Sequence, residues 1–119
     1  MRKIGDCIFV VGALLALFTQ TALAGDLNAQ HKRELTVFGS RAMGLQVGVN
    51  DVKKILSGAE IEKLVAAGIN LNGHLCARIT DIRPLKISGG YEVTCIAYRG
   101  GSAKKAYLLE ALKGIASEM

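Results

Sequence analysis

The sequence predicts an α+β fold in which one or two short helices pack on a small antiparallel β-meander of two to three strands, with one disulfide. Three observations lead to this prediction. A capping motif introduces helically spaced apolar residues in the middle of the chain. The spacing then changes to a period of two, which is typical of strands. Two cysteines, Cys76 and Cys95, fall in the alternating stretches.

The first 24 residues have the three parts of a secretory signal. Arg2 and Lys3 supply positive charge, residues 8–18 (IFVVGALLALF) are continuously apolar, and Ala22-Leu23-Ala24 matches a cleavage site. The apolar run is shorter than the roughly 20 residues that a membrane-spanning helix needs. We therefore expect a protein exported to the periplasm or secreted, beginning at Gly25 after cleavage and containing no transmembrane segment.

Cleavage would change the cysteine count, because Cys7 would leave with the signal. Cys76 and Cys95 then form an even pair in an exported chain, which predicts a disulfide. A bond that closes a loop of this length contributes about 3 kcal/mol to stability. The ligand spacings C-x-x-C and H-x-x-x-H do not occur, so we expect no metal and no cofactor.

The charge balance is mildly basic. The chain has 15 Lys and Arg against 10 Asp and Glu, a net charge of +5. Without Arg2, Lys3 and Asp6 it would have 13 basic and 9 acidic residues, a net charge of +4. This excess suits a protein that meets anionic lipid or cell-wall surfaces. It lacks the clustered charge of a nucleic-acid binder, so we expect no nucleic-acid partner.

Residues 25–49 are expected to be a leader followed by an irregular Gly-rich segment. The first part (GDLNAQHKRE) is polar and has no periodicity, which predicts a mobile leader. The second part begins like a short strand but contains Gly39, Gly44 and Gly48, which favours a loop or an irregular edge strand. The compact α+β domain would then span residues 50–119.

Residues 50–68 predict two short helices, or one kinked helix. Apolar residues recur at helical spacing on both sides of a break at Ser57. Ser57 and Glu60 form an S-x-x-E capping box that opens the second helix. Gly68 fits the left-handed stop at its C-terminus.

Alternating polar and apolar residues then predict a meander. Residues 75–80 form a first strand, which ends by Pro84 because proline cannot donate to a ladder. Residues 91–98 (YEVTCIAY) form a second strand, in which Tyr91, Val93, Cys95 and Ala97 share one face.

The chain after the second turn has two interpretations. We expect a third strand to about Leu109 and then a short helix over residues 110–116. The alternative is a continuous helix from Ala103, because AKKAYLLEALKGIA has high helix propensity throughout.

The region from His74 to Tyr107 carries the pattern L-C-A-x-I-x-x-I-x-P-L, then Y-E-V-T-C-I-x-Y-R-G-G-S, then Tyr107. It resembles a group of small, mostly uncharacterised secreted proteins of alphaproteobacteria. The resemblance implies export, a Cys-bridged meander and a third strand, and it brings no activity and no catalytic residues. A looser analogy, at the level of fold only, is to the PepSY-type helix-plus-sheet module.

The turn between the second and third strands is the candidate anion or partner site. Backbone amides at a Gly-Gly turn can form an anion-binding nest, and basic side chains add charge. The alternative is a plain hairpin with a solvated basic strand, since edge strands often carry Lys. The residues of this site are Arg99, Gly100, Gly101, Ser102, Lys104 and Lys105.

A wider basic face is a second hypothesis. Arg78, Arg83 and Lys86 lie around the first hairpin, and together with Lys104 and Lys105 they could make one basic face. Three tyrosines could interleave with these cations, or could instead pack over the sheet with their hydroxyls in water. The tyrosines are Tyr91, Tyr98 and Tyr107.

No catalytic residue is predicted. His74 has no nucleophile or orienting carboxylate nearby in sequence, and Cys76 and Cys95 are far apart for a redox pair. We expect a non-catalytic binding or interaction module, not an enzyme, whose partner is an envelope protein, a peptide or an anionic envelope component. The alternatives are a structural accessory subunit of an envelope complex, and a small redox factor that uses the two cysteines.

Overall fold

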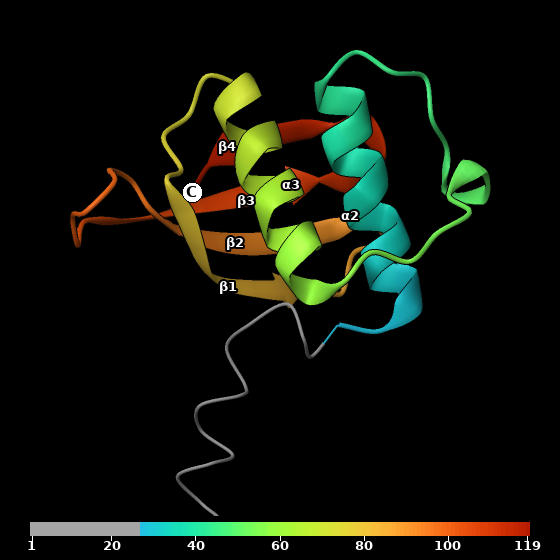
Figure 1. Ribbon diagram of the computed structural model, residues 1–119, viewed down its shortest axis with the longest axis horizontal. Coiled ribbons are helices and arrows are strands. Elements are labelled where there is room, and N and C mark those ends of the chain that lie inside the picture. Colours follow the sequence, from blue (N-terminus) through green and yellow to red (C-terminus); the bar gives the residue numbers. More distant parts are fainter. Residues whose placement is uncertain (1–26) are drawn as a thin grey trace, which may run out of the picture.

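The computed structural model describes residues 27–119, so the predicted signal and the cleavage site before Gly25 lie outside the described residues. Two helices, α2 (Ala29–Ala42) and α3 (Gly58–Leu71), lie side by side on one face of a four-stranded antiparallel sheet (Figure 1). The predicted α+β class is confirmed. The strands follow one another in space as in sequence: β1 (Arg78–Pro84), β2 (Gly90–Ile96), β3 (Lys104–Glu110) and β4 (Ile115–Glu118).

The core lies between the helices and the sheet. Alternation along β2 and β3 points one set of side chains at the helices, and β1 keeps its apolar residues on that side through a shift in register between Ile79 and Asp81. The predicted disulfide joins Cys76 to Cys95 inside this core, with both cysteines buried. The buried apolar side chains of the strands are Ile79, Ile82, Tyr91, Val93, Cys95, Ile96, Tyr107, Leu109 and Ala116.

The prediction of a leader and an irregular edge strand before residue 50 was wrong. Helix α2 occupies that region, and Leu35, Val37 and Phe38 are fully buried on it. Asn28 caps the helix by accepting a hydrogen bond from the His31 N–H at 2.7 Å, and the His31 ring accepts from the Asn28 N–H in return. This reciprocal pair replaces the usual Ser-to-Glu capping box.

The prediction for residues 50–68 was right in its second half. Ser57 caps α3 and forms the expected box with Glu60. The first predicted helix is only a 3₁₀ turn, η2 (Val49–Asp51). Gly68 does not end α3, which continues to Leu71; the left-handed residue that follows is Gly73, with φ +89°.

The C-terminal prediction was partly right. The third strand is present and runs to Glu110, so the continuous helix is excluded. The helix expected over residues 110–116 is a single 3₁₀ turn, η3 (Ala111–Lys113), and a fourth strand follows it. Gly114 makes this reversal possible, because it has φ +74° and lies against the backbone of α2.

Candidate functional site

The predicted turn is the tip of a hairpin that projects from the two-layer body. Strands β2 and β3 continue beyond the area that the helices cover, and the loop between them stands free at one side (Figure 1). All residues from Tyr98 to Lys105 are exposed, and the Tyr98 side chain is 60% accessible. The structure therefore brings together all six predicted residues of the turn on one exposed element.

The turn closes through its own backbone. The Gly101 N–H donates to the Tyr98 carbonyl at 2.9 Å, and Gly100 has φ +78°, as glycine allows at this position of a tight turn. Because the Gly101 amide is engaged inside the turn, it is not available to an anion. That amide therefore cannot be part of the predicted anion-binding nest.

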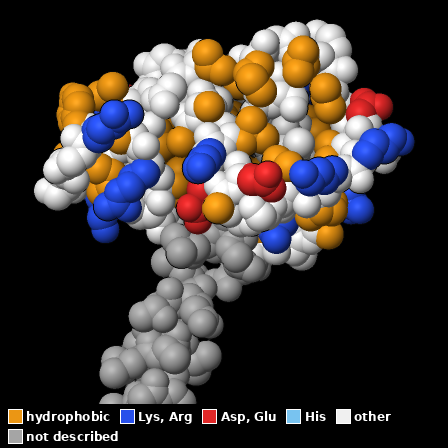
Figure 2. All heavy atoms as spheres, in the orientation of Figure 1, with side chains coloured by type: hydrophobic (Ala, Val, Ile, Leu, Met, Phe, Trp, Pro, Cys, Tyr) orange, Lys and Arg blue, Asp and Glu red, His pale blue; other side chains and the backbone are white. Residues whose placement is uncertain are grey.

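The charge of the hairpin comes from three cations, of which one is paired. Lys105 Nζ lies 3.6 Å from the Glu118 carboxylate of β4. Arg99 and Lys104 have no carboxylate within ion-pair distance among residues 27–119. Figure 2 shows Lys and Arg side chains gathered on the lobe that this hairpin forms at the left.

The wider basic face is only partly formed. Arg78 is in register with Ile96, which is in register with Lys104, so these two cations belong to one row across the sheet at the hairpin end. Arg83 lies towards the opposite end of β1 and pairs with Asp81 and Glu92.

The three tyrosines divide into two groups. Tyr91 and Tyr107 are buried among the core residues, and their hydroxyls donate to protein groups and do not point to water. Tyr98 alone lies beside the cations of the hairpin. The predicted packing over the sheet therefore holds for two of the three rings.

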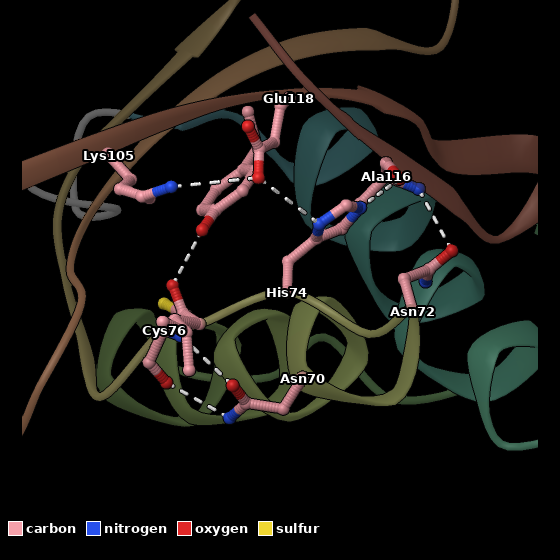
Figure 3. A network of polar contacts seen from close by, with 9 residues as sticks. Asn70, Asn72, His74, Cys76, Lys105, Ala116 and Glu118 are labelled. Atoms are coloured by element: carbon pink, nitrogen blue, oxygen red, sulfur yellow. Dashed lines mark hydrogen bonds and ion pairs between the residues drawn. The ribbon is translucent and has the colours of Figure 1, made fainter.

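His74 belongs to a polar network that closes the free edge of β4 (Figure 3). The Asn72 amide donates to Gly114 O at 3.1 Å and accepts from the Ala116 N–H at 3.2 Å. His74 Nε2 lies 3.0 Å from Ala116 O. Two side chains thus occupy backbone groups that an adjacent strand would use, which is one way proteins block pairing with other chains. The His74 Nδ1 atom is 3.9 Å from the Glu118 carboxylate.

A second asparagine fixes the chain at the disulfide. Asn70 Nδ2 donates to Cys76 O, and Asn70 Oδ1 accepts from the Cys76 N–H, both at 2.9 Å. Tyr107 donates to Leu75 O at 2.7 Å. The segment between α3 and β1 is therefore held from both layers, and the sulfur atoms lie beneath it in the core.

Two hollows beside the helices could not be predicted from the sequence, because they depend on how the helices pack. One, of about 440 Å³, lies between α3 and the N-terminal end of β1 and is lined by Ala59, Ala66 and Ala77 among others. The second, of about 180 Å³, lies between α2 and the β1–β2 loop, and the buried Glu34 is among its walls. Nothing in the sequence marked Glu34, since its surroundings were interpreted as a leader.

No family model, no curated protein and no solved structure matches this chain. Within residues 27–119, no group of His, Cys, Asp and Glu side chains is arranged to hold a metal ion. Neither helix of the same region is long and apolar enough to cross a membrane.

Proposed function

We propose that this protein is an exported, non-catalytic binding module that attaches to anionic lipid surfaces of the envelope through its β2–β3 hairpin. The observation that carries the proposal is the projection of Arg99 and Lys104 from the body, without carboxylate partners among the described residues. A basic side chain near an anionic bilayer contributes about 1 kcal/mol to binding.

The aromatic ring at the base of the same turn supports this choice of surface. Tyr98 is 60% exposed, whereas the other tyrosines are buried. A tyrosine has an apolar ring and a polar tip, and this combination suits the boundary between lipid headgroups and acyl chains. The hairpin therefore carries both exposed charge and an exposed aromatic ring.

Vesicle co-sedimentation tests the proposal. The protein recovered from exporting cells is mixed with phosphatidylglycerol–phosphatidylcholine vesicles, and separately with vesicles of phosphatidylcholine alone. We expect binding to the anionic vesicles that weakens as salt is added. The double variant Arg99→Gln/Lys104→Gln should lower the partition coefficient by about thirtyfold, the equivalent of about 2 kcal/mol.

A matched control removes the same charge elsewhere. Lys53 and Lys54 are also exposed, and the segment before α3 in which they lie is on the other side of the molecule from the hairpin (Figure 1). The variant Lys53→Gln/Lys54→Gln should keep most of the binding. Equal loss in both double variants would mean that only net charge matters, and absence of binding to anionic vesicles would end the proposal.

A further inference from the structure

Glu34 is a buried acid in the layer between α2 and the sheet. Glu34 is 9% exposed. Tyr91 Oη donates to Glu34 Oε1 at 2.6 Å, and Gln30 Nε2 donates to Oε2 at 3.2 Å. Both donors are neutral groups. Burial, together with the hydrogen bond to Glu34 and the charge of that carboxylate, raises the pKa of Tyr91, which keeps this hydroxyl a donor.

Among the described residues, the Glu34 carboxylate has no positive partner. No basic nitrogen of residues 27–119 lies within 4.0 Å of it. Burying a charge is costly unless it is both hydrogen-bonded and paired with an opposite charge. The two donors occupy only part of the four acceptor positions that a carboxylate offers. Within the part of the chain that the structure describes, the site therefore lacks a cationic donor.

The hollow beside Glu34 has room for such a donor. It is lined by Gln30, His31, Glu34 and Tyr91 on one side and by residues 84–90 on the other, and its volume is about 180 Å³. The His31 ring stands edge-on to Tyr91 with centroids 6.0 Å apart, which fixes that wall. A space of this size has room for a small head group.

We propose that this hollow, the Glu34 hollow, is a binding site for a primary ammonium group, held by the Glu34 carboxylate. The ammonium would donate to the free acceptor positions of the carboxylate and supply the missing positive charge. This inference is independent of the hairpin and of the proposed attachment to lipid.

The ammonium has two possible sources. One is Lys86, an exposed residue of the β1–β2 loop that also lines the hollow. The other is a small amine from solution. The chemistry is the same in both cases, and the Lys86→Met variant separates them.

The experiment follows amide and Gln30 side-chain NMR resonances while methylammonium chloride is added at constant ionic strength. Methanol is the matched neutral probe, because it has nearly the same size and no charge. We expect saturable shifts confined to residues 84–91 and to the first turns of α2 with methylammonium, and none with methanol. Glu34→Gln should weaken the affinity by about tenfold or more, since it removes a charge-assisted hydrogen bond. The exposed Glu110→Gln serves as the control variant.

Each outcome decides the matter. Tighter binding by Lys86→Met means that the Lys86 ammonium occupies the hollow in the wild type, and unchanged affinity means that the site is open to external amines. The proposal is overturned if neither the wild type nor Lys86→Met shows saturable shifts, or if methanol shifts the same resonances equally. The methanol comparison uses the wild type alone and so remains valid if Glu34→Gln does not fold.

Discussion

The ring of Phe38 on α2 lies against the backbone of Gly68 on α3. A Cβ atom added at Gly68 would stand 2.5 Å from Phe38 Cε2. A second contact runs the other way, since Leu64 of α3 fills the space that the missing side chain of Gly39 leaves on α2. The two helices therefore interlock through one glycine and one large side chain each.

Gly68→Ala should destabilise the protein by about 1–3 kcal/mol, because overpacking outweighs the gain in helix propensity. Urea unfolding followed by circular dichroism measures the change. Gly68→Ala should cost less stability in a Phe38→Leu background than in the wild type, because the smaller side chain leaves room for the added methyl group. A stabilising effect of Gly68→Ala alone would contradict the close contact.

Glycines in and after α2 also explain why the sequence did not predict this helix. In the sequence, Gly39 and Gly44 favour a loop, but in the structure Gly39 lies in the helix interior where Leu64 needs space. The cap at Asn28 uses His31 in place of the usual Glu, so no standard motif marked the start. Local propensity cannot distinguish a glycine that ends an element from one that serves a tertiary contact.

The strands were easier to predict, because period-two alternation records burial directly. Tyr107 and Leu109 are buried as alternation requires, although the surrounding sequence favours a helix. The short β4 left no such signal, since it depends on a left-handed Gly114. Likewise the basic hairpin is local in sequence and was predicted, whereas the Glu34 hollow joins residues about 60 positions apart and was not.

Asn72→Ala should lower the free energy of unfolding by about 1–3 kcal/mol, since Gly114 O and the Ala116 N–H lose their partner. Hydrogen exchange adds a local readout, because the Ala116 amide should exchange faster in the variant. The exposed Asn50→Ala is the control and should change neither quantity. Unaltered exchange at Ala116 would show that Asn72 does not hold this edge.

Tyr91 should make stability depend on pH in the alkaline range. The pKa of Tyr91 is raised in the folded state, so the folded chain keeps a proton that the unfolded chain releases near pH 10. The contribution of protonated Tyr91 to the free energy of unfolding is therefore complete below about pH 10. Above that pH the free energy of unfolding declines by as much as about 1.4 kcal/mol per pH unit. Urea unfolding between about pH 8 and about pH 11 measures how the free energy of unfolding changes with pH.

Comparison with two phenylalanine variants isolates that effect. Tyr91→Phe should have a shallower alkaline slope than the wild type, while Tyr98→Phe should match the wild type because Tyr98 is exposed. Identical slopes for all three proteins would mean that Tyr91 titrates as it does in the unfolded chain.

Replacing both bridged cysteines, Cys76→Ser/Cys95→Ser, should cost about 3 kcal/mol, as expected for a bond across 19 residues. Cys7→Ser is the matched control, since the predicted cleavage removes Cys7 from the exported protein. Urea unfolding of both purified variants gives the comparison. A cost within experimental error for the double serine variant would mean that the bond does not support the fold.

The intact mass of the protein recovered from exporting cells, after alkylation without a reductant, tests export and disulfide formation together. The account predicts the mass of a chain that begins at Gly25 and carries no alkyl group. A chain that still begins at Met1, or one that gains two alkyl groups, would contradict it.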